Sequence, residues 1–415
     1  MSPFGYTVLG FGGGKNQVPI AEDLTDFYHE IDATGTSNVP MGHIAIDPFD
    51  STRILMVFRD DGTYGSDLQA VCGTIDYAGS DITWGTVVDV TTEYADGGFV
   101  EFDPSTQHSF MVYGGFRSSN TPYHGAVAGT LSGTTITLGS IVNISTVGTN
   151  DTVYYTNGKF NPNTAGQFVC IGLNYNNFTT YRNADIKVLS VSGTTITEEF
   201  EDNAVINQNC SQPIISWDIT AQTGYIWLNG DSTYPRVFPF SMSGHTPTIG
   251  SEHIISSSSS GEYCWGASDG ALAGRIVSTY KKSDGHMYCR VGNNSSGTIT
   301  WGTEVKAADF DDLGSHLMLY NQVQCDKNTP GKFLFSWNVN TASPRRAKVG
   351  TITDADTITY GSDVNGIGGT EGTDIIWNDV RPDPNNPGRF WMGGKHTGDG
   401  SKGKITASQI ASFEL

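Results

Sequence analysis

Seven Asp or Asn residues recur along the chain at intervals of 51 to 58 residues, and their side-chain oxygens could bind metal ions. They are Asp47, Asp103, Asn161, Asp218, Asp269, Asp326 and Asp383. Four of them precede Pro, and Asp or Asn at the head of a turn bonds its own backbone. Equivalent positions in a wide ring of repeats would also lie too far apart to share one ion. We therefore interpret these residues as turn residues and predict no metal site and no cofactor.

Other sequences that resemble catalytic or ligand-binding motifs lack residues that those motifs require. The glycines between Leu9 and Lys15 resemble a phosphate-binding loop, but Leu9 stands where the first Gly is needed and Asn16 where the hydroxyl is needed. No two histidines have the close spacing of a zinc site, and we expect no Gly-x-Ser-x-Gly motif, which would mark a nucleophile elbow. The segment 80–85, Ser-Asp-Ile-Thr-Trp-Gly, partly resembles the Asp-box of sialidase-like propellers without its Gly. No pair of carboxylates is singled out by spacing, and Arg345 and Arg346 look incidental. We predict that the protein is not an enzyme.

Tyr, Asn, Ser and Gly are frequent in the loops expected between the second and third strands of several repeats. Aromatic rings and amides of this kind form adaptable binding surfaces and also recognise sugars. The candidate binding residues are Arg59, Asp60, Tyr64, Tyr123, Asn176, Tyr181, Arg182, Asp231 and Tyr234. In the alternative interpretation, the tyrosines only cover the ends of the repeats.

The elements that position these residues are short strands. In the second repeat, strands are expected at 98–102, 110–113, 126–129 and about 132–139, with the Asp103 turn between the first two. The last strand has a signature, Ile-Thr-x-Gly, that recurs with variations six times, whereas the turn recurs seven times. Residues 6–10 form an additional strand, which we expect to complete the last repeat.

Four-stranded units with this period predict an all-β, seven-bladed β-propeller of antiparallel blades, closed by an N-terminal strand. We expect one domain over residues 1–415, with a closing strand in 1–12 and an insertion at 13–37. The predicted blades span 38–92, 93–148, 149–204, 205–257, 258–308, 309–366 and 367–415. Within the insertion, apolar residues of the segment 20–31 lie at helical spacing, which suggests a short amphipathic helix or an ordinary surface insertion.

Composition limits the partners. The net charge of −20 on 415 residues argues against nucleic acid and against anionic membrane surfaces. No apolar stretch is long enough for a transmembrane helix, and the first residues do not resemble a secretory signal. The six cysteines form no Cys-x-x-Cys pair, so we expect free thiols made in a reducing compartment.

The repeat itself resembles a known group of proteins. The stretches 126–140, 187–197, 296–305 and 349–364, with their Gly-Thr-Thr-Ile-Thr-Leu-Gly-like sequence, resemble repeats of propeller-like proteins from tailed bacteriophages, especially marine and cyanobacterial ones. The resemblance implies a non-enzymatic virion protein on the particle surface, either a head decoration or a tail protein that attaches to the host. It implies other virion proteins as partners, a host-surface glycan or protein as ligand, and assembly in the host cytoplasm. The alternatives are an extracellular protein that binds carbohydrate, or a sialidase-like enzyme on the same scaffold.

Overall fold

The structure is a computed structural model. It describes residues 24–30, 42–62, 65–77, 81–118, 121–146, 156–176, 181–206, 210–230, 234–257, 264–309, 322–337, 346–353, 356–365, 375–396 and 403–410. These residues form strands and turns, with no helix among them. No part of the described chain therefore qualifies as a membrane-spanning helix.

The described strands form seven antiparallel sheets of four or five strands. In six sheets the first four strands follow sequence order from the centre outward, whereas the outermost strand of the last sheet is N-terminal to the others. The first sheet contains β2 (Gly42–Ile46), β3 (Arg53–Gly62), β4 (Gly65–Asp76) and β5 (Asp81–Trp84), and β6 (Val88–Thr91) also pairs with β4. The second contains β7 (Tyr94–Phe102), β8 (Ser109–Ser118), β9 (Thr121–Ser132), β10 (Thr135–Leu138) and β11 (Val142–Thr146). The third contains β12 (Thr156–Phe160), β13 (Gln167–Asn176), β14 (Tyr181–Ser192) and β15 (Thr195–Ile206).

The fourth sheet contains β16 (Cys210–Asp218), β17 (Thr223–Gly230), β18 (Arg236–Ser243), β19 (Thr246–Ile249) and β20 (His253–Ile254). The fifth contains β21 (Trp265–Ser268), β22 (Arg275–Lys281), β23 (Met287–Ser295), β24 (Thr298–Trp301) and β25 (Val305–Ala308). The sixth contains β26 (Gln322–Cys325), β27 (Lys332–Trp337), β28 (Arg346–Ile352), β29 (Ile358–Tyr360) and β30 (Val364–Asn365). The last contains β31 (Ile375–Pro382), β32 (Arg389–His396), β33 (Gly403–Ile410) and β1 (Leu24–Glu30).

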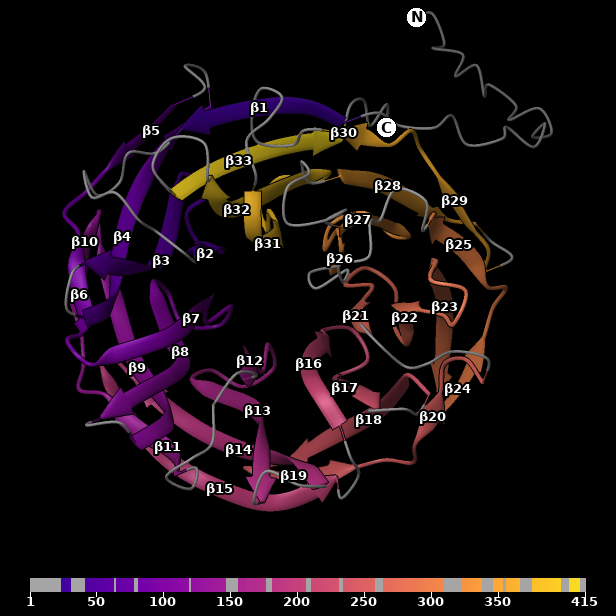
Figure 1. The fold of residues 1–415 in the computed structure, drawn as a ribbon, viewed down its shortest axis with the longest axis horizontal. Helices are drawn as coiled ribbons and strands as arrows, with labels where there is room; N and C mark the ends of the chain where they lie inside the picture. The colour runs from indigo at the N-terminus through magenta and orange to yellow at the C-terminus, as the bar shows by residue number, and fades with distance from the viewer. Residues whose placement is uncertain are drawn as a thin grey trace, which may run out of the picture.

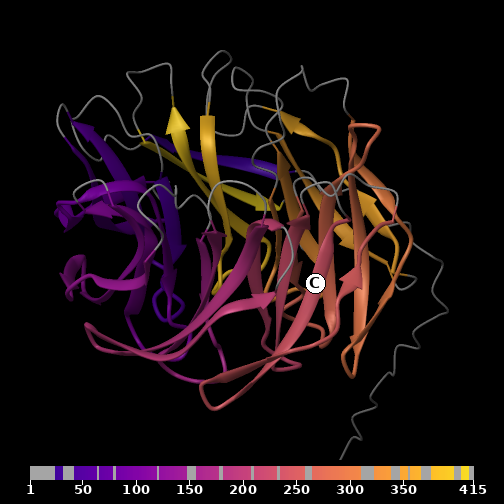
Figure 2. The same cartoon turned by 60° about the horizontal axis from the view of Figure 1, so that its bottom comes forward.

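The sheets stand around a central axis as the blades of a β-propeller, with their first strands innermost (Figure 1). In the turned view, the strands of the sheets run between the two faces of the ring (Figure 2). Apolar side chains of adjacent blades pack into shared clusters, such as the one that joins Leu55 and Val57 of β3 to Phe110 and Val112 of β8. The predicted fold is confirmed. Two strands differ from the expected ranges: β15 ends at Ile206, beyond the boundary expected at residue 204, and β1 lies in the range expected to be an insertion.

An N-terminal strand closes the ring, as predicted, but it is formed by other residues. β1 pairs antiparallel with β33, from Leu24 opposite Ile410 to Glu30 opposite Lys404. The strand expected at 6–10 lies outside the described residues. The helix suggested for 20–31 is wrong, because its described part is β1. The segment contains Thr25 and two adjacent aromatic residues, which favour strands, and the open edge of β33 offers hydrogen-bond partners that an isolated short helix lacks.

The recurring turn residues hold neighbouring blades together. All seven Asp or Asn side chains are buried. In the second blade, Asp103 Oδ1 accepts a hydrogen bond from the backbone N–H of Ser105 (2.8 Å), which confirms the turn interpretation. Its other oxygen, Oδ2, accepts one from the N–H of Gly166 in the third blade (2.7 Å). Gly166 has a φ of +71°, a left-handed conformation that favours Gly. The same bond joins Asp218 to Gly274, Asp269 to Gly331 and Asp326 to Gly388.

The Gly of the fourth-strand signature also has a structural reason. A Cβ atom on Gly139 would lie 1.9 Å from the carbonyl oxygen of Thr194 in the next blade, so no side chain fits there. The outer strand of this blade is interrupted after Gly139 and resumes as β11. In the third blade Glu199 occupies the equivalent position, and β15 continues without interruption.

Candidate functional site

A pocket on the axis of the ring is lined by the residues that stand two positions before each turn Asp or Asn. These residues are Ala45, Glu101, Lys159, Ser216, Ala267, Gln324 and Arg381. The residues directly after the turn Asp or Asn line it as well, namely Pro48, Pro104, Pro162, Ile219, Gly270, Lys327 and Pro384. We call this cavity, of about 120 Å³, the central pocket, and the end of the propeller that carries the Asp turns the turn face.

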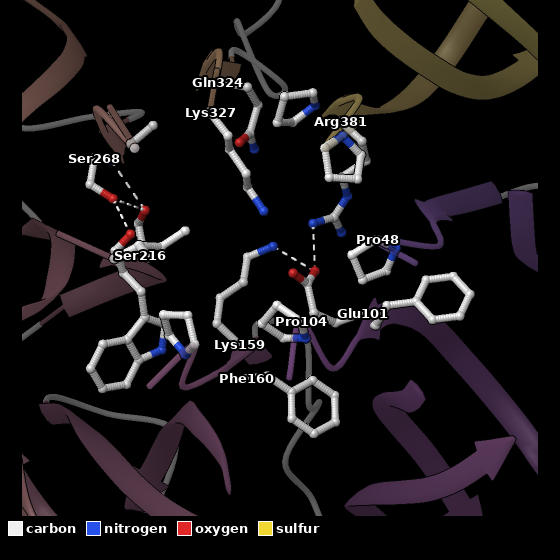
Figure 3. Close-up of a pocket in the computed structure, with 18 of the residues that line it drawn as sticks. Pro48, Glu101, Pro104, Lys159, Phe160, Ser216, Ser268, Gln324, Lys327 and Arg381 are labelled. Atoms are coloured by element: carbon white, nitrogen blue, oxygen red, sulfur yellow. Dashed lines mark hydrogen bonds and ion pairs between the residues drawn. The ribbon is translucent and has the colours of Figure 1, made fainter. Parts of the chain in front are cut away.

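The central pocket contains a cluster of three cations around one carboxylate (Figure 3). Lys159 Nζ donates to Glu101 Oε2 at 2.6 Å, and Arg381 Nη1 donates to the same oxygen at 2.8 Å. Arg381 is held from behind, because its Nε donates to Asp379 Oδ2 at 2.8 Å. The same Asp379 oxygen accepts a bond from the backbone N–H of Ile44 at 3.2 Å, so the cluster spans the junction between the last and first blades.

Of the three cations, Lys327 makes the fewest hydrogen bonds and ion pairs within the described residues. Its side chain reaches toward the other cationic groups (Figure 3). Within the described part of the chain, its ammonium group has no hydrogen bond and no ion pair. An ammonium group has three N–H donors. Lys327 therefore offers all three to a ligand, whereas Lys159 has already used one on Glu101.

The charges in the pocket shift each other's pKa values. Burial, together with the positive charge of Arg381, lowers the pKa of Lys159 from 10.5 to about 8 despite the attraction of Glu101. Burial opposes the ionisation of Glu101, but Lys159 and Arg381 hold the pKa of its carboxyl group below the ordinary value. Burial also lowers the pKa of Lys327, although the attraction of Glu101 opposes this shift. The pocket lining therefore carries three basic side chains and one carboxylate, in a chain whose net charge is −20.

Two hydroxyl groups lie on the opposite side of the pocket from Glu101 and Arg381 (Figure 3). The Oγ atoms of Ser216 and Ser268 are 2.8 Å apart, and Ser268 Oγ donates to the carbonyl oxygen of Trp217 at 2.5 Å. Ser268 also lies in a Gly-x-Ser-x-Gly sequence, residues 266–270, so the expectation of no such motif was wrong. The motif here ends an inner strand and enters an Asp turn instead of a helix, so it is not the strand-to-helix nucleophile elbow.

The predicted loop residues lie at the other end of the strands. Arg59 and Asp60 belong to β3, Asn176 to β13, and Tyr181 and Arg182 to β14, close to where each hairpin turns. These hairpin ends are separated from the turn face by the length of the second strand, so the predicted residues do not line the central pocket.

The four remaining predicted residues have different outcomes. Tyr123 is buried, and its hydroxyl group donates to the carboxylate of Glu93. Tyr123 thus covers the end of its blade, as in the alternative interpretation. Tyr234 is 41% exposed. Tyr64 and Asp231 lie outside the described residues.

Sequence interpretation missed the central pocket. Glu101, Lys159, Lys327 and Arg381 are far apart in the chain and match no motif. For Glu101, Lys159 and Arg381, the signal is the variation at one fixed position, two residues before the turn Asp or Asn, where the repeats carry Ala, Glu, Lys, Ser, Ala, Gln and Arg. For Lys327, it is the variation at the position directly after the turn residue, where four of the other repeats carry Pro.

Comparison with solved structures shows the same fold in proteins of distant sequence. The periplasmic gluconolactonase PpgL of Pseudomonas aeruginosa superposes with a TM-score of 0.53 at 11% identity, over 86% of this chain and 95% of that chain. A putative 6-phosphogluconolactonase of Bacteroides fragilis gives 0.51 at 8% identity, over 78% and 83%. Sqt1 of Chaetomium thermophilum, bound to the N-terminus of the ribosomal protein L10, gives 0.53 at 8% identity, over 90% and 87%. No protein-family model and no curated sequence matches the chain.

These structures correct one prediction. The chain was expected not to be an enzyme because no catalytic motif was found, but two of the structures compared above are named as lactonases. The absence of a sequence motif is therefore no ground for excluding an enzyme on this scaffold. At 8 to 11% identity the likeness establishes the fold, and the chain is a β-propeller related in architecture to proteins of several activities.

Proposed function

We propose that the central pocket binds an anionic carbohydrate, that is, a sugar or sugar acid with a carboxylate or phosphate group. The observation that carries the proposal is the presence of three cations around a single carboxylate in an otherwise strongly acidic protein. Lys327 and Lys159 supply N–H donors that the protein itself leaves unused, and ionised donors form the stronger hydrogen bonds.

The remainder of the pocket suits the neutral part of a sugar. Prolines and Ile219 of the turns present apolar surface to its C–H groups, while Gln324 and the two serines offer polar contacts. A cavity of this kind needs roughly 10–15 Å³ for each water molecule, so about 120 Å³ has room for a small ligand. The lactonases among the similar structures add gluconate and 6-phosphogluconate to the ligands worth testing.

Lys327→Met is expected to weaken the binding of gluconate and 6-phosphogluconate by roughly 10-fold to 100-fold, because a hydrogen bond to a charged group contributes about 1.5–3 kcal/mol. Isothermal titration calorimetry with the wild-type protein should detect both anions but not glucose, which lacks the charge. Lys306→Met is the matched control, since Lys306 is exposed, pairs with Asp309 and lies outside the pocket. Equal affinity for glucose, or an equal effect of the two substitutions, would contradict the proposal.

The same titration has an expected pH dependence. Lys159 is cationic below its pKa of about 8 and loses its charge as the pH rises through that value. The carboxylate of gluconate stays ionised in this range, so its affinity should fall several-fold between about pH 7 and about pH 9.5. An affinity that does not change over this range would show that Lys159 does not contribute its charge.

We also propose a setting for this binding, which is the surface of a bacteriophage particle. The proposal is supported by the repeats at 126–140 and 296–305, which resemble those of tailed-phage proteins and which here contain the fourth strand and the turn before it in two blades. The partners would be other capsid or tail proteins, and the anionic carbohydrate would belong to the host surface. Labelling intact particles with an antibody against the purified chain, followed by electron microscopy, should locate it on the head or tail. Particles that carry no label, while the same antibody detects the chain in the infected cell, would contradict this setting.

A further inference from the structure

The serine pair of the central pocket has a defined proton arrangement. Three contacts fix it: Ser268 Oγ lies 2.5 Å from the carbonyl oxygen of Trp217, the two Oγ atoms are 2.8 Å apart, and the backbone N–H of Ser268 donates to Ser216 Oγ at 3.2 Å. A carbonyl oxygen can only accept, so the single hydroxyl proton of Ser268 is directed to Trp217. The bond between the two hydroxyl groups must then use the proton of Ser216.

Both hydroxyl protons are therefore used inside the protein. Each serine oxygen donates once and accepts once, and one lone pair remains on each. The pair can accept hydrogen bonds from a ligand, but it cannot donate without breaking an internal bond. The opposite side of the pocket has the reverse character, because Lys159, Lys327 and Arg381 can only donate.

We infer that Ser216 and Ser268 determine the specificity and orientation of the ligand: they select anions that carry hydroxyl groups at the end away from the charge, such as aldonates, over carboxylates without hydroxyl groups. This inference rests on the proposed function. A carboxylate placed at the serines would face lone pairs, whereas a ligand hydroxyl group there can donate to them. The ligand is thus oriented with its charge on the cations and its hydroxyl groups on the serines.

The test compares two anions of equal charge and carbon number, gluconate and hexanoate, by calorimetry on the full chain. The wild type should bind gluconate about tenfold more tightly or better, since each neutral hydrogen bond contributes roughly a 3-fold to 10-fold gain in affinity. Ser216→Ala should weaken gluconate by about that factor and leave hexanoate unchanged. Ser268→Ala should also reduce the ratio, because the Ser216 hydroxyl proton loses its acceptor and can turn toward the ligand. Ser140→Ala, at an exposed position outside the pocket, is the matched control.

The outcomes separate the two proposals. If gluconate and hexanoate bind equally and Ser216→Ala has no effect, while Lys327→Met weakens both, the role of the serines is overturned and the anion site stands. If the wild type binds neither anion, both proposals fail. Circular dichroism checks that the variants fold. If neither serine variant folds, the wild-type ratio of the two affinities decides, and a ratio near one rejects the inference.

Discussion

Removal of residues 1–30 is expected to destroy the cooperative folding of the ring. The deletion takes away β1, whose seven residues pair with seven residues of β33. At about 0.5–1.5 kcal/mol net for each backbone hydrogen bond, the lost ladder costs several kcal/mol, a large part of a typical unfolding free energy of about 5–15 kcal/mol. The exposed edge of β33 is also open to pairing with other chains. Thermal unfolding followed by circular dichroism, with light scattering for aggregation, measures both effects.

The control is a shorter deletion, of residues 1–12, which leaves β1 in place. It removes the strand that the sequence suggested as the closing element at 6–10. The structure predicts a much smaller decrease in melting temperature for this deletion than for the removal of residues 1–30. Equal decreases would show that β1 is not the strand that closes the ring.

The substitution Asp269→Ala is expected to cost about 3–5 kcal/mol of unfolding free energy, the usual effect of removing one partner from a buried ion pair. Asp269 is fully buried and accepts from the N–H of Ala271 in its own turn and from Gly331 in the next blade. Arg275 donates to Asp269 Oδ2 from Nε at 2.8 Å and from Nη2 at 2.5 Å, and it would be left without this carboxylate. Urea unfolding should show a lower midpoint with an unchanged slope.

Two further variants test whether the loss of stability comes from the hydrogen bonds and the ion pair of Asp269. Asp269→Asn keeps one acceptor oxygen and should lose less, because the third blade already uses Asn161 at this position. Asp309→Ala removes an exposed carboxylate that pairs with Lys306, and no measurable change is expected. A wild-type midpoint for Asp269→Ala would show that the contact between blades does not contribute to stability.

Local chemistry allowed much of this fold to be predicted from the sequence. The turn residues were identifiable because an Asp or Asn followed by Pro favours one local geometry. Their second role could not be predicted, because the bond from Asp103 to Gly166 joins residues of different blades. Closure by an N-terminal strand followed from counting six fourth strands against seven turns. The segment that closes the ring was misplaced because residues 24–30 fit a helical period as well as a strand, and the edge of β33 decides between them.

The central pocket was beyond sequence interpretation for a different reason. Glu101 and Arg381 are far apart in the chain, and they meet only because the ring brings the last blade against the first two. Motif searches look for residues at fixed spacing, so a charge cluster assembled from several blades gives no such signal. The prediction that the chain is not an enzyme rested on the same kind of motif search, and the similar structures named as lactonases correct it. The candidate site was also predicted at the wrong end of the propeller. The Tyr and Asn residues indicated the loops between the second and third strands, whereas the pocket is formed by the variable positions beside the turn residues.

The pairing of β1 with β33 has a consequence for biosynthesis. The strand β1 finds its neighbour only after residue 410 has been made, so every strand from β2 to β32 must be translated before the last blade is complete. During that interval the N-terminal segment has no partner in its own blade. A translation product that stops before β33 would therefore leave the ring open, with no strand for β1 to pair with.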